Sequence, residues 1–255
     1  MRSWIPAGAA LVAAVACASG CAHHREASGG TTTSSAPPQV TTTATASGGL
    51  DGCVGKRDGK KVAIRVAGAR LHGVVVGHGS VGVVLAHEKG DDLCSWLPYA
   101  HHLARLGFTA LAFDFETYAA GLVESVVAAA DALRRHATAG IVLIGASMGG
   151  TAVLDAARKV PDVVGVVSAS GPASYGDADA SRAVRELRVP LLFIVARDDT
   201  EFVGDARSLY RHARSSDKTL EVLPGFAHGT GFFAPPLSGR ALRLTDRFVA
   251  EHGHQ

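Results

Sequence analysis

The stretch IVLIGASMGG, residues 141–150, decides the fold of this chain. It begins with an uninterrupted apolar run that has the length of a buried strand. Directly after the run, residues 145–149 match the pattern G-x-S-x-G. In that pattern a strand turns sharply into a helix, small residues make room for the turn, and the serine hydroxyl stands above the sheet edge. The stretch therefore predicts Ser147 as a nucleophile, and a turn with a structural serine is the alternative that the motif alone leaves open.

Two later strands end beside residue types that a serine nucleophile needs. The apolar run at 190–196 ends before Asp198 and Asp199, and the run at 219–223 is followed by a loop that contains His228. A serine hydroxyl needs a base to take its proton, and the base needs a carboxylate to orient it. The chain order serine, aspartate, histidine is the order found in α/β-hydrolases. Residue types and order thus predict a catalytic triad.

From about Leu50 to the C-terminus the chain resembles an α/β-hydrolase of the serine esterase or dienelactone-hydrolase-like kind. The residues that carry this resemblance are Gly145-Ala146-Ser147-Met148-Gly149, Phe226-Ala227-His228-Gly229 and Leu85-Ala86-His87 before Trp96. The resemblance implies Ser147 as nucleophile and His228 as general base. An exposed loop histidine is the alternative for His228.

The resemblance also implies the acid of the triad. In the family pattern a small residue ends the strand and the acid follows three positions later, which from Ala196 gives Asp199. Its neighbour Asp198 is the first alternative, with a role in capping the turn or facing solvent, and Glu201 is the second.

An oxyanion hole needs two hydrogen-bond donors. The backbone N–H of Met148, directly after the nucleophile, is the first candidate. The resemblance points to the backbone of Lys89, in the loop after the third strand, as the second. The chain departs from the family pattern here, because His87 is followed by Glu88 where the family commonly has glycine. A backbone donor does not depend on side-chain identity, so we expect the hole to persist, although its position is open.

The alternation of apolar runs with helical patterns predicts a mostly parallel central sheet with helices on both faces, and the resemblance implies that this is an α/β-hydrolase fold. Only residues 171–189 separate the strand at 163–168 from the next one, so no large cap domain is expected and the site should be open. The sequence Gly77-His78-Gly79-Ser80 is interpreted as a hairpin loop between two strands. The expected strands are 61–66, 71–76, 81–86, 108–113, 141–144, 163–168, 190–196 and 219–223, and the expected helices are 96–106, 122–136, 149–159, 204–214 and 237–252.

Composition limits the function classes. The chain has 255 residues, of which 47% are hydrophobic and 19% charged, which suits one catalytic domain over residues 50–255 and is too short for two such cores. The formal net charge is +2, and the sequence contains no block of Lys and Arg of the kind that binds a nucleic-acid backbone. Nucleic acid is therefore not expected as a partner, and no cofactor is expected either.

The first twenty residues have the features of a signal peptide. Arg2 precedes an apolar stretch from Trp4 to Ala18, which is too short to span a bilayer permanently. Ala18-Ser19-Gly20-Cys21 resembles a bacterial lipobox, which implies lipidation of Cys21 and a membrane anchor. An ordinary secretory signal is the alternative, and Cys17 is a weaker acylation candidate. Either interpretation predicts a bacterial protein that is exported.

Residues 21–49 are rich in Ser, Thr and Pro and have almost no large apolar side chains. Such a segment cannot bury enough surface to offset its ordering entropy, so it is predicted to be a flexible tether. Because an oxidising compartment favours disulfides, Cys53 and Cys94 are expected to pair, with two free thiols as the alternative. No Cys or His pairs have the spacing of a zinc site, so no metal is expected.

Two functions from different classes follow from these observations. The first is an exported serine hydrolase that cleaves small carboxylic esters, or related thioesters or lactones, through Ser147, Asp199 and His228. The second is a catalytically degraded hydrolase fold that serves as a surface lipoprotein and binds a ligand or partner. The His87-Glu88 pair is the sequence feature that favours the second.

Overall fold

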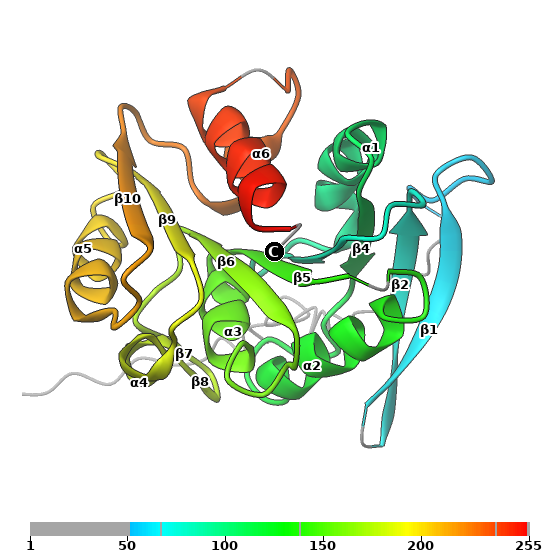
Figure 1. The fold of residues 1–255 in the computed structure, drawn as a ribbon, viewed down its shortest axis with the longest axis horizontal. Coiled ribbons are helices and arrows are strands. Elements are labelled where there is room, and N and C mark those ends of the chain that lie inside the picture. The colour runs from blue at the N-terminus through cyan, green and yellow to red at the C-terminus, as the bar shows by residue number, and fades with distance from the viewer. Residues whose placement is uncertain (1–51, 67, 138, 238, 254–255) are drawn as a thin grey trace, which may run out of the picture. The chain divides into compact units, whose positions relative to one another are not determined.

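The computed structural model describes residues 52–66, 68–137, 139–237 and 239–253. The predicted signal peptide, the tether and Cys21 lie outside these residues. The described residues form an eight-stranded sheet in the order β1-β2-β4-β3-β5-β6-β9-β10, with helices packed against it (Figure 1). Strands β4, β3, β5, β6, β9 and β10 are parallel, whereas β1 pairs with β2 and β2 pairs with β4 antiparallel. The predicted fold class is confirmed.

Each strand of this sheet lies on an apolar run that predicted it. In β3, β4, β5 and β9 every residue is buried, as expected for strands covered on both faces. The bounds are Lys60–Val66 (β1), Ala69–Val76 (β2), Gly82–Ala86 (β3), Thr109–Phe113 (β4), Ile141–Ala146 (β5), Val163–Ala169 (β6), Leu191–Ala196 (β9) and Lys218–Leu223 (β10).

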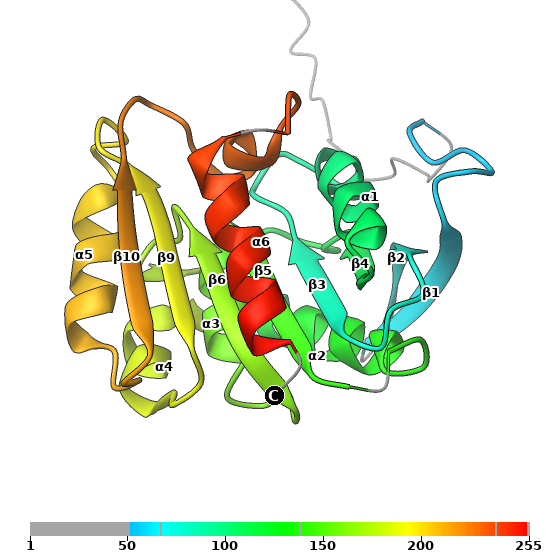
Figure 2. The same ribbon diagram turned by 45° about the horizontal axis from the view of Figure 1, so that its top comes forward.

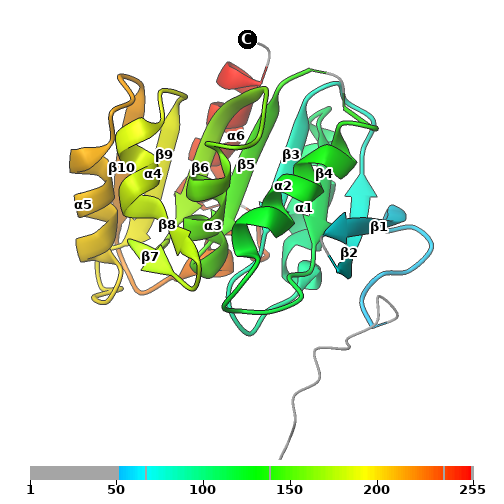
Figure 3. The same cartoon turned by 90° about the horizontal axis from the view of Figure 1, so that it is seen from below.

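Helices cover the two faces of the sheet separately. Helices α1 (Leu97–Arg105) and α6 (Arg240–His252) lie on one face, in front of the sheet in Figure 2. The other face, seen in Figure 3, carries α2 (Leu122–Leu133), α3 (Met148–Ala156), α4 (Ala180–Glu186) and α5 (Val203–His212). Two short 3₁₀ helices, η1 (Leu93–Trp96) and η2 (Gly229–Phe233), lie in loops. Among the described residues, no helix has the length and apolar character needed to cross a membrane.

The structure contradicts the hairpin interpretation of Gly77-His78-Gly79-Ser80. Strand β4 lies between β2 and β3 in the sheet, so the segment that joins β2 to β3 is not a hairpin loop. Its glycines serve a close backbone approach instead. A Cβ at Gly77 would collide with the carbonyl oxygen of Phe108, and one at Gly79 would collide with that of Gly107.

The connection between β6 and β9 contains no inserted helical cap. It holds a small hairpin, β7 (Ser174–Tyr175) paired with β8 (Ala178–Asp179), and then α4. Asp179 begins this helix, because its side chain accepts a hydrogen bond of 2.9 Å from the backbone N–H of Arg182. The expectation of a short helix and loop is confirmed, and the hairpin is an addition to it.

Candidate active site

Ser147 stands at a sharp turn between β5 and α3. Its backbone has φ of 46° and ψ of −115°, a conformation that a residue with a side chain adopts only when its surroundings enforce it. The surroundings are tight, since a Cβ at Gly145 would meet the backbone of Gly149, and one at Gly149 would meet the carbonyl oxygens of Ala86 and His87. The small residues of the motif therefore have the steric role that the sequence predicted.

The imidazole of His228 and the carboxylate of Asp199 are in direct contact. The Nδ1–H of His228 donates to Oδ2 of Asp199 at 2.8 Å. The hydroxyl of Ser170, at the end of β6, donates to the same oxygen at 2.8 Å. A proton held on Nδ1 leaves Nε2 as the basic nitrogen of a neutral imidazole. The arrangement therefore fits Asp199 as the residue that orients His228.

The competing carboxylates lie elsewhere. Asp198 turns toward its neighbour Arg197, with 3.6 Å between Oδ1 of the acid and Nε of the guanidinium. Glu201 is exposed to solvent. The ring of Phe202, in contrast, packs on His228 with 4.4 Å between the ring centroids. Of the three acids considered from the sequence, only Asp199 contacts the imidazole.

Ser147, Asp199 and His228 follow β5, β9 and β10, so all three leave the same edge of the sheet, the carboxyl edge of the parallel strands. Helix η2, which begins directly after His228, contacts both β5 and β6. The chain thus crosses back from β10 toward the serine. Among the described residues no hydrogen bond joins the Ser147 hydroxyl to His228. Catalytic hydrogen bonds are often long before substrate binds.

Glu88 lies on the other side of the imidazole. Its Oε2 is 3.7 Å from Nε2 of His228, and its Oε1 accepts a hydrogen bond of 2.6 Å from the hydroxyl of Thr230. The same hydroxyl is 2.9 Å from Oδ2 of Asp91. Burial, together with the nearby charge of Asp91, raises the pKa of Glu88, while Thr230 and His228 oppose this shift. The sequence marked Glu88 as a departure from the family pattern but did not predict that it faces His228.

Gly229 makes room for Glu88. This residue has φ of 48°, in the left-handed region that favours glycine. A Cβ there would collide with Oε2 of Glu88. The left-handed backbone therefore favours glycine after the histidine, and any side chain at this position would also displace the carboxylate of Glu88.

His87 is a structural residue that supports the loop after β3. Its ring is buried, Nδ1–H donates to the carbonyl oxygen of Glu88 at 2.7 Å, and Nε2 accepts from the backbone N–H of Phe115 at 3.1 Å. Burial lowers the pKa of His87, which keeps the ring neutral. Both ring nitrogens are occupied, so His87 joins this loop to the segment after β4.

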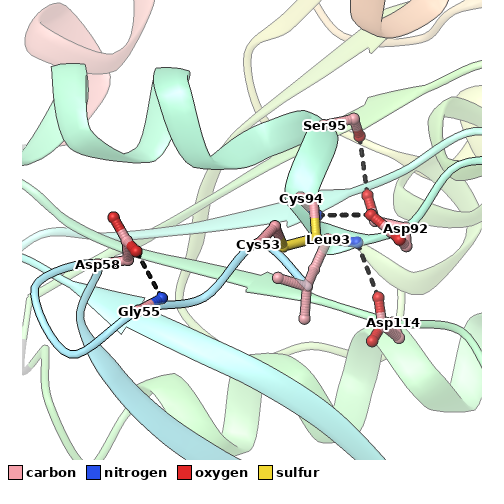
Figure 4. Close-up of a disulfide and its surroundings, with 8 residues drawn as sticks. All are labelled: Cys53, Gly55, Asp58, Asp92, Leu93, Cys94, Ser95 and Asp114. Atoms are coloured by element: carbon pink, nitrogen blue, oxygen red, sulfur yellow. Dashed lines mark hydrogen bonds between the residues drawn. A yellow bond between two sulfur atoms is a disulfide. The ribbon is translucent and has the colours of Figure 1, made fainter. Parts of the chain in front are cut away.

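Side chains also hold the next part of this loop (Figure 4). Asp92 accepts from the backbone N–H of Cys94 at 2.8 Å, and Asp114 accepts from that of Leu93 at 2.7 Å. A disulfide joins Cys94 to Cys53, with 5.9 Å between the Cα atoms. The two cysteines paired in the sequence analysis therefore link the beginning of the described chain to the loop that carries Glu88.

The two donors expected for an oxyanion hole have free backbone N–H groups. Met148 is the first residue of α3, where N–H groups have no intrahelical partner. Lys89 lies in a turn in which Asp91 N–H donates to the carbonyl oxygen of Glu88 at 3.3 Å. Within the described ranges, no acceptor takes the N–H of either residue. Both groups are thus available to a ligand, as the sequence hypothesis requires.

Comparisons with known proteins agree with this fold. Residues 116–239 match the model of the dienelactone hydrolase family. A dienelactone hydrolase from Anabaena variabilis is 23% identical over 76% of this chain and 95% of that one, with a TM-score of 0.58. An esterase from Pyrococcus furiosus is 18% identical over 76% of this chain and 92% of that one, with a TM-score of 0.65. No curated protein matches the chain.

The fold, with a serine at the turn after β5, is the α/β-hydrolase fold. The family whose model residues 116–239 match is the dienelactone hydrolase family, and the solved structures named above share this fold.

Metal binding stays untested. Among the described residues, no three or more His, Cys, Asp or Glu side chains gather as a metal ion would require. A cold-adapted esterase from an Arctic intertidal metagenomic library, solved with zinc bound, is 16% identical over 76% of this chain and 92% of that one, with a TM-score of 0.58. The expected lack of a metal therefore remains a prediction.

Proposed function

We propose that the chain is a serine esterase in which Ser147, His228 and Asp199 form the catalytic triad. The observation that carries the proposal is the 2.8 Å hydrogen bond between Nδ1 of His228 and Asp199, at the sheet edge where Ser147 stands in its strained turn. The dienelactone hydrolase match and the esterase neighbours support an ester-hydrolysing enzyme.

The proposed mechanism has two halves. Nε2 of His228 takes the proton of Ser147 while the serine oxygen attacks the ester carbonyl carbon, and the protonated ring then gives that proton to the leaving alkoxide. Water, activated by the same nitrogen, hydrolyses the acyl-enzyme. Asp199 stabilises the positive ring, and the N–H groups of Met148 and Lys89 hold the oxyanion. Such donors act most strongly when they need no rearrangement.

The proposed substrates are small or accessible esters, with thioesters and lactones as related possibilities. No cap is inserted between β6 and β9 to enclose the site. The side chain of His228 is 31% exposed, and Phe226, in the loop before it, is 79% exposed. Both observations favour an open site over a deep, covered one.

The second candidate function is a binding protein without turnover. It is favoured by Glu88, whose carboxylate faces Nε2 at 3.7 Å, where a base must instead face the serine. An ionised Glu88 that held a proton on Nε2 would prevent His228 from acting as a base.

Fluorophosphonate labelling separates the two functions. We expect the purified chain to be labelled at neutral pH, and Ser147→Ala to abolish labelling. Ser181→Ala, at the start of α4, is the matched control and should be labelled like the wild type. Unlabelled wild-type protein would favour the binding protein.

We further propose export and lipid attachment at Cys21, supported by the sequence before this cysteine. Mass spectrometry of the N-terminal peptide of the chain produced in a bacterium should find a diacylglyceryl group on Cys21. The modification should be absent from Cys21→Ser and retained in Cys17→Ser. A cleaved peptide without lipid would show an ordinary secretory signal.

A further inference from the structure

A cavity of about 620 Å³ opens at the edge of the sheet opposite the proposed active site. It lies between the start of β1, the end of β2 and the C-terminal end of α1. Val76, at the end of β2, pairs with Ala110 near the start of β4, so this is the amino edge of the parallel strands. Ser147, Asp199 and His228 all follow strands at the carboxyl edge. The cavity is therefore separate from the triad.

Cations line this cavity without counter-charges. Arg57, Lys60 and Arg105 contribute to its wall, together with three histidines, and no carboxylate does. Within the described ranges, none of these three cations forms an ion pair or a side-chain hydrogen bond. The nearby carboxylate of Asp58 lies 3.3 Å from Nε2 of His101.

Several cations elsewhere in the chain are paired with carboxylates. Arg158 contacts both Asp155 and Glu186, at 2.7 and 2.6 Å, and Lys159 contacts Glu124 at 2.9 Å. These pairs show that several cations on other surfaces have acidic neighbours. The cavity differs from these surfaces in gathering three cations around one hollow, in a chain whose formal net charge is only +2.

Local structure explains the cations one at a time but not together. Arg105 lies in the last turn of α1, where a cation complements the helix dipole, and Lys60 begins an edge strand, where a charge discourages pairing with another chain. Neither reason places them around one cavity. The pKa of His136, also in the wall, is lowered by partial burial and then by the charges of Lys60 and Arg135, which is consistent with a positive potential there.

The remaining wall is apolar. Val75, Val76 and Ala104 line it. Apolar walls beside charged groups strengthen the attraction of an ion that enters. The volume lies within the range of about 300–1,000 Å³ that is typical of small-molecule sites.

We propose that this cavity binds a small organic anion through a phosphate group. The guanidinium groups of Arg57 and Arg105 suit the oxygens of a phosphate, and Lys60 adds a third positive charge. The organic part of the ligand lies against Val75, Val76 and Ala104. A free phosphate ester and the headgroup of an anionic lipid share this chemistry.

Calorimetric titration of the full chain with glycerol 3-phosphate tests the proposal. We expect saturable binding at one site, and no binding of glycerol. The double variant Arg57→Gln/Arg105→Gln should weaken binding by at least about tenfold, because each residue supplies charge-assisted hydrogen bonds. The matched control is Arg65→Gln/Arg70→Gln, which removes the same charge from the other end of the β1–β2 pair, where these exposed residues face each other in register. It should weaken binding less than about twofold.

Sedimentation with vesicles distinguishes the two sources of the phosphate. Greater binding to phosphatidylglycerol than to phosphatidylcholine vesicles, reduced only by the cavity variant, would identify a lipid headgroup. Binding of glycerol 3-phosphate without a vesicle preference would identify a free phosphate ester. No saturable binding of either probe, or equal weakening by both double variants, would overturn the proposal. Thermal unfolding of both variants checks that they remain folded, and the single variants Arg57→Gln and Arg105→Gln replace the double variant if it does not.

Discussion

His228 has a carboxylate on each side, and the two carboxylates are held in different ways. Asp199 follows the fully buried strand β9, and its partner Ser170 follows β6, the neighbouring strand. Glu88 instead lies in a loop whose position depends on side chains: His87, Asp92, Thr230 and the disulfide at Cys94. The first side is fixed by the sheet, and the second by a set of individual contacts.

This difference suggests different roles for the Asp199 side and the Glu88 side of the imidazole. A rigid carboxylate at Nδ1 is what an imidazole base requires, because its orientation must not change during the reaction. The loop after β3 carries Lys89, the proposed second oxyanion donor, and faces Nε2 of His228, where the proposed mechanism places the substrate. Substitutions on the β9 side should therefore lower the rate of ester hydrolysis. Substitutions that remove contacts of the loop after β3 should first lower the free energy of unfolding.

The largest effect is expected on the β9 side. Asp199→Asn should lower kcat for p-nitrophenyl acetate by about 10⁴-fold, because the amide no longer holds the correct tautomer of His228. Asp198→Asn is the matched control and should lower kcat by less than about threefold. Steady-state kinetics of the two variants measure this difference. The reverse order would show that Asp198 is the acid.

Removal of the disulfide should have the next largest effect. Cys53 and Cys94 are 41 residues apart, and a link that closes a loop of this length stabilises a protein by up to about 4 kcal/mol. Urea unfolding of Cys53→Ser/Cys94→Ser should show a loss of this order, and reductant should lower the free energy of unfolding of the wild type but not of the variant. A variant as stable as the wild type would show that the loop does not depend on the link.

His87→Leu should cost about 2–3 kcal/mol of stability, because it leaves the N–H of Phe115 and the carbonyl of Glu88 without their partner. His72→Leu is the control, since His72 is exposed on β2. Urea unfolding measures both. Equal values for the two variants would mean that His87 does not hold the loop.

The smallest effect concerns pH. Burial raises the pKa of Glu88, so the folded state favours the neutral acid, and the stability that this acid contributes is lost as the pH rises through its raised pKa. Glu88→Gln keeps a neutral group at this position. The variant should therefore gain stability relative to the wild type at pH 8 and lose most of that advantage at pH 4.

Thermal unfolding at the two pH values measures this difference. Glu116→Gln, at an exposed residue, is the control and should show no such dependence. A gain for Glu88→Gln that is equal at both pH values would contradict the proposed cause.

The position of the residues on the β9 side follows from the sequence pattern more directly than that of the residues in the loop after β3, for a physical reason. Ser147, Asp199 and His228 each follow an apolar run, so their common edge follows from the parallel sheet. Glu88 also follows a strand, but its orientation depends on Thr230, a residue far away in the sequence. Ser170 follows β6 without any motif that points to Asp199.

The strand order shows the same limit. Every strand of the main sheet corresponds to an apolar run in the sequence, but the run does not show which strand lies beside it. The placement of β4 between β2 and β3 results from pairing of segments that are distant in sequence, such as Gly73 with Phe113. Local pattern indicates which segments are strands, while tertiary contacts decide their partners.

Because Gly229 has no side chain, the carboxylate of Glu88 can lie directly beside it. A Cβ at residue 229 would meet the carboxylate of Glu88, so substitutions at the two positions should be non-additive, and a side chain at 229 also meets the strain of the left-handed backbone. In any redesign of the space beside His228, residues 88 and 229 should therefore be varied together.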